Sequence, residues 1–222
     1  MMDFSAELHG ISLFEGIEPQ DIPELLGCLQ TKCLMYKKDE IIIEEGSDVQ
    51  SFGIVLSGHG RVIKWDESDR VVIITMLQKG SVFGVMVAAS SDHRIPVTVQ
   101  ALETMQALII PFDRIIARCT KNCRSHEILL RNYIHAVAEK GLELHERVDC
   151  LLRPSARGKV LVYLERLVRE QGSRVVSVPF NRNAMAQYLN IERSALSREL
   201  SNMKRDGLLD YYKNSFKLLE LP

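Results

Sequence analysis

Short apolar runs alternate with turn residues between Leu34 and Phe112. The runs are rich in isoleucine, valine and phenylalanine, and glycine, aspartate and serine separate them. Several short strands with turn signals at this spacing predict an antiparallel β-roll or jelly roll. Ahead of them, residues 5–30 predict a short helical segment, with Asp21 as a candidate cap and Pro23 in its first turn. The predicted strands are Ile41–Ile43, Ser51–Leu56, Arg61–Trp65, Val71–Leu77, Thr98–Leu102 and Ala107–Ile110.

A heptad pattern of apolar residues follows over residues 124–152. The apolar residues are spaced alternately four and three apart and form one seam, with charged residues mostly outside it. This predicts a helix shared between two chains, or alternatively one amphipathic helix packed on its own domain; we favour the shared seam. A glycine in the seam lets two backbones approach closely, although it costs about 1 kcal/mol of helix propensity. The seam residues are Leu130, Ile134, Val137, Gly141, Leu144, Val148 and Leu151.

Pro154 interrupts this helical pattern, because proline disfavours helical geometry at the residue before it. Ser155 can cap a new helix that runs to about Glu170. We therefore predict a hinge here and an α+β chain in three parts. These are a β-roll domain over residues 1–123, a dimerisation helix with its hinge over 124–153, and a carboxyl-terminal domain over 154–222. The strands expected in the last part are Arg174–Phe180 and a hairpin, or wing, formed by Leu208–Tyr212 and Phe216–Leu221.

Two short helical patterns joined by a tight turn lie between Asn181 and Gly207. Asn181 is a candidate N-cap, and Asn190 can adopt the left-handed conformation that a sharp turn requires. Ala186 provides the small side chain needed where two helices cross, and Gly207 closes the second helix. The pattern predicts a helix-turn-helix, whose second helix lies in the DNA major groove. The apolar residues expected to face inward are Met185, Leu189, Ile191, Leu196, Leu200 and Met203.

The side chains left facing outward near the start of the second helix are polar or basic. An arginine can donate two hydrogen bonds to O6 and N7 of guanine, a base contact worth about 1–3 kcal/mol. Serine hydroxyls and further basic residues suit phosphate oxygens or a second base edge. The alternative is an ordinary helical pair with a solvated polar face. We predict DNA contacts by Arg182, Arg193, Ser194, Ser197, Arg198 and Lys204, with Arg205 as a further basic residue.

Composition indicates the class of protein and its compartment. The 222 residues are 46% hydrophobic and 26% charged, and no segment approaches the roughly 20 apolar residues of a membrane span. The amino terminus lacks the features of a signal peptide, and five cysteines in no regular framework fit a reducing cytoplasm. Residues 154–222 carry 12 Lys and Arg against 7 Asp and Glu, whereas residues 1–153 carry 16 against 22. Positive charge therefore accompanies the predicted helix-turn-helix, where double-stranded DNA would be met.

A β-roll, a long dimerising helix and a winged helix-turn-helix, in this order, resemble the CRP/FNR superfamily of bacterial transcription regulators. The resemblance covers nearly the whole chain. It implies a homodimer formed through residues 124–152, an inverted-repeat operator, and RNA polymerase as a partner. Ser194 stands where the family commonly has a glutamate, and a serine cannot accept from cytosine N4 as a carboxylate does. The roll carries the family's turn glycines and Phe-Gly step as Gly46, Gly58, Gly80, Phe83 and Gly84.

The sensor pocket departs from the cyclic-nucleotide-binding members of that family. Their Phe-Gly step precedes a glutamate for the ribose, and an arginine-serine pair holds the phosphate; this chain has Val85 and Ile95-Pro96 there. Arg94 is one residue away, and on a strand that shift points it to the opposite face. A phosphodiester needs a fixed cation or convergent N–H donors, so we expect a small, largely apolar effector other than cyclic AMP. Its expected lining is Gly84, Val85, Met86, Ile95, Val97, Leu144 and His145.

Redox and haem sensing are weighed as alternatives. An iron–sulfur cluster of the family's kind needs thiolates ahead of the roll, and no cysteine precedes Cys28. His93 and His145 are candidate haem ligands, although each is better interpreted as a solvated or hydrogen-bonded histidine. We predict no metal and no cofactor, and keep a ligand-independent or a redox- or haem-responsive regulator as the alternative. The cysteine pairs interpreted as small apolar residues are Cys28 with Cys33 and Cys119 with Cys123.

An enzyme is the remaining class to consider, because jelly rolls of the cupin kind hold metals for oxygenase chemistry. Such a site needs two or three histidines and a carboxylate that converge inside the roll. Residues 34–112 contain only His59 and His93, which lie far apart in the sequence. We therefore predict no catalytic residues and no enzymatic activity.

Overall fold

The computed structural model describes residues 4–117, 124–179 and 181–219. Its contacts divide the chain into two compact units within which most packing occurs. One boundary between them falls inside the long helix α5 (Arg124–Leu152), between Leu142 and Glu143. The helix itself ends at Leu152, as the proline predicts. The first unit comprises Met1–Lys64 and Ile74–Leu142, and the second comprises Trp65–Ile73 and Glu143–Pro222.

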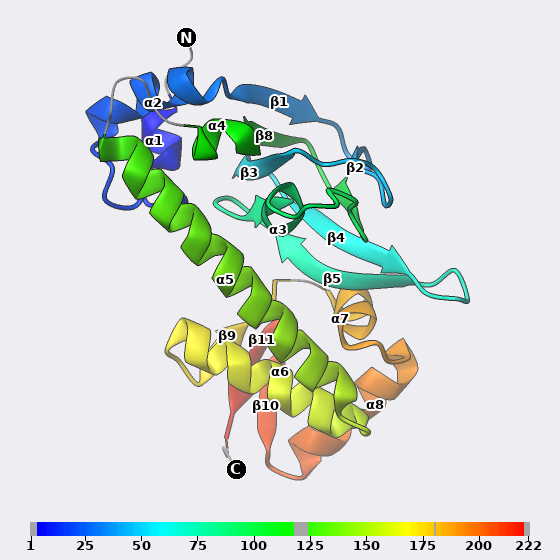
Figure 1. Cartoon of the computed structure of the whole chain (residues 1–222). Coiled ribbons are helices and arrows are strands. Elements are labelled where there is room, and N and C mark those ends of the chain that lie inside the picture. Colours follow the sequence, from blue (N-terminus) through cyan, green and yellow to red (C-terminus); the bar gives the residue numbers. More distant parts are fainter. Residues whose placement is uncertain (1–3, 118–123, 180, 220–222) are drawn as a thin grey trace. The chain divides into compact units, whose positions relative to one another are not determined.

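The strands of the amino-terminal part form two four-stranded sheets, ordered β1-β8-β3-β6 and β2-β7-β4-β5 (Figure 1). Pairing between β1 and β8, β3 and β8, and β4 and β7 is antiparallel, as an antiparallel roll requires. The prediction of a β-roll is confirmed. The strands are β1 (Lys32–Tyr36), β2 (Ile41–Ile43), β3 (Ser51–Ser57), β4 (Gly60–Trp65), β5 (Val71–Leu77), β6 (Val82–Phe83), β7 (Thr98–Ala101) and β8 (Met105–Pro111).

Short helices accompany the roll. Pro23 lies in the first turn of α2 as predicted, but Asp21 makes no side-chain cap. Its backbone continues a 3₁₀ turn, and its carboxylate instead accepts a hydrogen bond of 3.2 Å from the hydroxyl of Ser125. The helices are α1 (Ser5–Leu8), η1 (Ser12–Phe14), η2 (Pro19–Asp21), α2 (Ile22–Leu29), α3 (Val85–Ala88) and α4 (Phe112–Ile116).

Strand β3 is buried on both faces, which explains its continuous apolar sequence. Phe52, Ile54 and Leu56 belong to one core cluster, together with α2 and the first turns of α5. Val55, whose side chain points the other way, belongs to a second cluster inside the roll. Tyr133 of α5 completes the first cluster, because its hydroxyl donates a hydrogen bond of 2.6 Å to the carbonyl of Val85.

The described residues of the second unit include the last turns of α5, helices α6, α7 and α8, and a three-stranded sheet ordered β10-β11-β9. Ser155 caps α6, since its hydroxyl accepts from the backbone N–H of Gly158 at 3.0 Å, and the predicted cap is confirmed. Gly172 ends this helix in the left-handed conformation, with φ of 63°. The elements are α6 (Ala156–Gln171), β9 (Val175–Ser177), α7 (Arg182–Leu189), α8 (Arg193–Arg205), β10 (Leu209–Tyr212) and β11 (Ser215–Leu218).

Candidate nucleic-acid interface

Helix α7 and the turn after it follow the geometry that the sequence predicts. The side-chain oxygen of Asn181 accepts from the N–H of Ala184 at 3.0 Å and so caps the helix. Asn190 adopts the left-handed conformation, with φ of 49°, and ends it. The N–H of Ile191 then returns to the carbonyl of Ala186 at 3.1 Å. These local bonds turn the chain sharply into α8.

Helix α8 buries one face completely. Leu196, Leu200 and Met203 have no exposed surface, and Ala186 of α7 is also buried, as expected for a close crossing of two helices. On the flank of α8, Arg157 of α6 holds two carboxylates, with its Nε 2.6 Å from Glu199 and its Nη2 2.7 Å from Asp206. Apolar packing and this two-armed arginine together fix the position of α8 on α6.

The opposite face of α8 is exposed and polar. Arg193, Ser194, Ser197 and Arg198 all lie on it, as predicted. Within the part of the chain that the structure describes, the guanidinium groups of Arg193 and Arg198 form no hydrogen bond or ion pair. Ser201 lies on the same face and was missed, although its spacing of three from Arg198 and seven from Ser194 could have identified it. The two guanidinium groups are available to an external partner, whereas the hydroxyl of Ser201 donates to the carbonyl of Ser197 at 3.0 Å.

Two of the predicted DNA contacts have partners inside the protein. Arg182 is half-buried, and its guanidinium carbon lies 4.9 Å from the centroid of the Tyr211 ring and 4.7 Å from that of Phe216. Burial lowers the pKa of Arg182 accordingly. The Nζ of Lys204 lies 2.5 Å from a carboxylate oxygen of Asp210, a hydrogen bond that raises the pKa of this lysine. The side chain of Lys204 is exposed, but part of its charge is already neutralised by Asp210.

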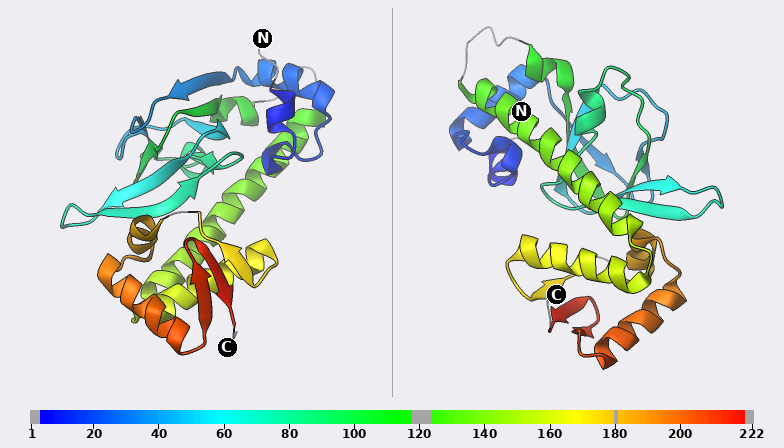
Figure 2. Two further views of the ribbon diagram at one scale, coloured as in Figure 1. Left: turned by 180° about the vertical axis from the view of Figure 1, so that it is seen from behind. Right: turned by 60° about the horizontal axis from the view of Figure 1, so that its bottom comes forward.

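The predicted wing is present as the antiparallel hairpin of β10 and β11, which follows α8 in the second unit (Figure 2). Leu209, Phe216 and Leu218 are buried beneath it. Lys213 occupies the hairpin turn with φ of 52°, and Tyr212 beside it is largely exposed. The wing therefore presents a cation and an aromatic ring at its tip.

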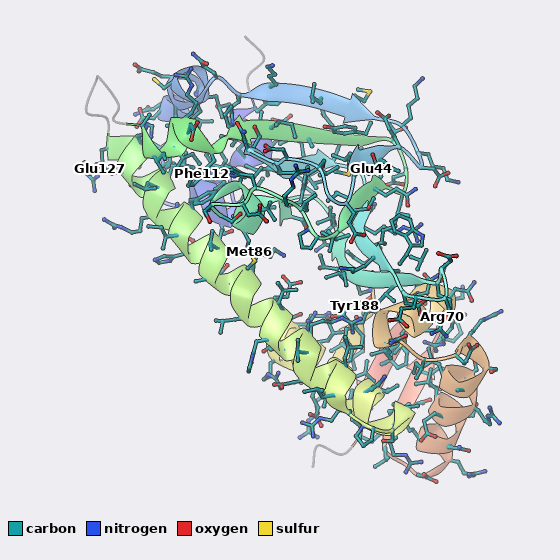
Figure 3. The ribbon with its side chains drawn as sticks, turned by 45° about the vertical axis from the view of Figure 1, so that its right-hand side comes forward. Glu44, Arg70, Met86, Phe112, Glu127 and Tyr188 are labelled. Carbon is teal, nitrogen blue, oxygen red and sulfur yellow. The ribbon has the colours of Figure 1, made fainter. Side chains whose placement is uncertain are left out.

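The residues expected to line an effector pocket are distributed over separate environments. Val85 lies in the core cluster that includes Tyr133, whereas Ile95 and Val97 pack in the cluster inside the roll. Gly84 forms the turn before α3 with φ of 77°, and Met86, labelled in Figure 3, is exposed. Leu144 and His145 are exposed residues of the second unit. Within the first unit, Val85 thus packs in a different core cluster from Ile95 and Val97.

The polar groups around Ile95 match the expectation from strand alternation. Ile95 is buried, whereas Arg94 is exposed and its Nη1 donates to the carbonyl of Gly46 at 2.7 Å. His93 has a buried Nδ1 without a hydrogen-bond partner among the described residues. A different cavity of about 560 Å³ opens on the roll, and none of the expected effector residues lines it. Its apolar wall consists mainly of Leu34, Tyr36, Ile41, Ile43, Phe83 and Ile109.

The described residues give little indication of a metal site, of thiol chemistry or of a membrane span. They contain no group of three His, Cys, Asp or Glu side chains arranged to hold a metal. Cys28 and Cys33 are free thiols, while Cys119 and Cys123 lie outside the described residues. In the same part of the chain, no helix combines the length and apolar character needed to cross a membrane.

Comparison with known proteins covers both parts of the chain. Residues 33–122 match the cyclic nucleotide-binding domain family, and residues 158–222 match the Crp-like helix-turn-helix domain family. The chain is 22% identical over 219 residues to the transcriptional activator protein FnrA of Stutzerimonas stutzeri, covering 96% of this chain and 86% of the relative.

Solved structures share the fold. A mutant of CooA from Carboxydothermus hydrogenoformans matches with a TM-score of 0.70 and 18% identity, over 88% of this chain and 87% of that one. FixK2 from Bradyrhizobium japonicum matches with a TM-score of 0.64 and 19% identity, over 86% and 93% of the two chains. The order of roll, long helix and helix-turn-helix is therefore that of these proteins.

Proposed function

Since this chain belongs to the CRP/FNR family of transcription regulators, which are not enzymes, we propose that it is a homodimeric, sequence-specific DNA-binding regulator controlled by a small effector other than cyclic AMP. One observation carries the DNA-reading part of this proposal. Helix α8 is fully buried on one face and presents Arg193 and Arg198, without internal partners among the described residues, on the other. A helix so placed can enter the major groove with two arginines free to read bases.

The roles within the interface can be assigned from these contacts. Arg198 and Arg193 read base edges, while Ser194 and Ser197 contact phosphates or a second base. Lys213 at the tip of the wing reaches the adjacent backbone, as a flexible point charge on an exposed turn can. Arg182 supports the wing through Tyr211 and Phe216 more than it contacts DNA, because its guanidinium is already covered by the two rings.

The homodimer is proposed from apolar side chains of α5 that the single chain leaves exposed. They recur at heptad spacing, whereas Leu130 and Val137 of the predicted seam pack partly against the core of their own chain. Exposed large apolar residues in a row mark a surface that a partner covers. The exposed large apolar residues of this seam are Ile134, Leu144 and Val148.

A two-fold dimer implies the form of the operator. Its two recognition helices would meet half-sites in inverted repeat, with centres about 34–36 Å apart. The likeness to FnrA, a transcriptional activator, supports RNA polymerase as a further partner. We place the protein in the cytoplasm, where a regulator of this kind meets the chromosome.

The proposal of an effector other than cyclic AMP rests on what occupies the anchor positions. Val85 and Ile95 are buried apolar residues, and Arg94 is engaged by the carbonyl of Gly46. A phosphodiester placed there would lose its hydration without gaining a cation. The cavity of about 560 Å³ on the roll has the size and the largely apolar wall that suit a small organic effector.

The test is selection of bound DNA from a random pool, with and without a cell extract as a source of effector. We expect an enriched inverted repeat whose half-sites lie one helical turn apart. A variant with Arg193 and Arg198 both replaced by alanine is the control, and it should enrich nothing. Enrichment of the same sequences by that variant, or none by the wild type under either condition, would contradict the proposal.

A further inference from the structure

A small pocket lies wholly within the second unit, between the last turns of α5 and helix α6. Its volume is about 210 Å³. Arg147 of α5 and Arg166 of α6 line it, together with Tyr188 of α7, which is labelled in Figure 3. Arg147 is only 4% exposed, so a permanently charged group sits in the interior of this unit.

Arg147 has more donors than partners. Its Nη2 donates to the carbonyl of Ile73 at 3.1 Å, and its guanidinium carbon lies 3.9 Å from the centroid of the Tyr188 ring. Its Nε and Nη1 are buried and have no hydrogen-bond partner among the described residues. An unpaired buried donor is unfavourable, and more so on a charged group. Two donor nitrogens of Arg147 can therefore bind an acceptor from outside the protein.

No carboxylate neutralises this cation. Burial lowers the pKa of Arg147, and the side chains that oppose this shift are the phenols Tyr188 and Tyr163 and the thiol Cys150. Burial raises the pKa of Cys150, so the thiol is neutral at pH 7. A buried charge without a counter-charge is a source of instability that an anionic ligand would remove.

Carboxylates also line the pocket, namely Glu146, Asp149 and Glu165. Glu146 lies 3.7 Å from Arg169, and the ring of His145 lies 4.0 Å from Asp149, both on exposed side chains. The Nε of Arg166 lies 3.0 Å from a carboxylate oxygen of Glu170, so part of its charge is neutralised. Arg147 is therefore the cation of this pocket that has no carboxylate partner among the described residues.

We propose that this pocket binds a small oxyanion, with Arg147 as its principal ligand and Arg166 as a second cation on the facing helix. The shared chemistry is a phosphate or carboxylate group, and the volume suits inorganic phosphate or a metabolite of a few heavy atoms. Arg166 also donates from Nη1 to the hydroxyl of Tyr188 at 3.2 Å, so both arginines hold the first helix of the helix-turn-helix. An oxyanion in the pocket would change the contacts through which the two arginines hold α7. If the protein binds DNA as proposed above, this would also change its affinity for the operator.

The test uses the full chain and sodium phosphate as the probe. The melting temperature is measured against phosphate concentration, with sodium chloride at matched ionic strength as the reference. A ligand that binds the folded state raises the melting temperature. Sodium acetate and glycerol phosphate form further arms, which distinguish a carboxylate site from an inorganic or an organic phosphate site. At least one arm should raise the wild-type melting temperature above the chloride reference, with saturation at millimolar concentration or below.

Two variants locate the effect. Arg147→Met should abolish the rise, whereas Arg174→Gln, which removes an exposed arginine elsewhere in the same unit, should keep it. Arg147→Lys retains the charge with fewer donors and should weaken binding at least tenfold without abolishing it; it decides the matter if Arg147→Met does not fold. No anion-specific rise in the wild type, or an equal rise in the Arg147 variants, overturns the proposal. Because these titrations contain no DNA, their failure leaves the proposed DNA binding intact, and the converse also holds.

Discussion

Replacing both Ile134 and Val148 of α5 by glutamate should convert the proposed dimer into monomers. The two side chains are 59% and 51% exposed in the single chain, so the fold of one chain depends little on them. They are better targets than Val137 of the same seam, which packs partly against the core of its own chain. The double variant should therefore retain its helical content and its melting transition.

The expected loss of dimer stability follows from the exposed area of these two side chains. Full burial of an isoleucine or valine contributes about 1.5–3 kcal/mol, and roughly half of each side chain remains to be buried by a partner. Two residues on each of two chains then contribute about 4 kcal/mol of dimer stability. At 1.4 kcal/mol per tenfold change, their loss weakens dimerisation by about 10³-fold before any repulsion between the glutamates is counted.

Sedimentation velocity over roughly 0.1–100 μM measures this directly, because the range brackets a dissociation constant of about 1 μM, which corresponds to a binding free energy of about −8.2 kcal/mol. The wild type should sediment as a dimer and the double variant as a monomer. His135→Glu places the same charge at an exposed position of α5 outside the seam and should remain dimeric. A wild type that is monomeric at the highest concentration, or a double variant that remains dimeric, would refute the assignment of the seam.

Four further outcomes follow from the second unit and the roll. Arg198→Ala should lose about 1–3 kcal/mol on the operator and relax one base pair per half-site; an equal loss on random DNA in a binding titration would contradict base reading. Asp210→Asn frees Lys204 and should strengthen binding to any DNA with a steeper salt dependence; an unchanged salt slope would contradict this. Leu200→Ala, at a fully buried position, should cost about 2–5 kcal/mol in urea unfolding; a loss below 1 kcal/mol would mean that α8 is loosely packed. Calorimetric titration with cyclic AMP should show no binding, and micromolar affinity with a matching gain in operator affinity would overturn our interpretation of Ile95.

The helix-turn-helix could be predicted from the sequence because the residues that determine it act locally. The cap at Asn181, the left-handed Asn190 and the buried Leu196 and Leu200 all act within a few residues of where they stand. The internal partners of Arg182 and Lys204 could not be predicted in this way. Arg182 meets Tyr211 across the wing, a contact that depends on how β10 packs against α7. A basic residue in a DNA-binding part of a chain therefore predicts a phosphate contact only if it has no partner inside the protein.

The layer that each apolar residue of the roll joins could not be predicted, for a different reason. In a strand buried on both faces, apolar residues form one continuous run, and the sequence does not reveal which layer each residue joins. Val55 of β3 joins the interior of the roll, while its neighbours Ile54 and Leu56 join the cluster next to α5. Val85 and Ile95, which the family resemblance places along one pocket, likewise pack in different clusters. Alternation predicts such layers well only where one face is polar.

Helix α6 links the two sites of the second unit. Near its start, Arg157 holds the carboxylates of Glu199 and Asp206 on and after α8. Two turns further along, Arg166 holds the hydroxyl of Tyr188 on α7. Both helices of the helix-turn-helix are thus attached to α6 by arginines with directional bonds, in addition to apolar packing. A change in the oxyanion pocket beside Arg166 would then move α7 and α8 through the same helix. A ligand can shift the arrangement of these helices only by the difference in its affinity for one arrangement over another. An oxyanion held mainly by Arg147 would therefore change operator affinity only as far as Arg147 binds it differently in the arrangement that binds DNA.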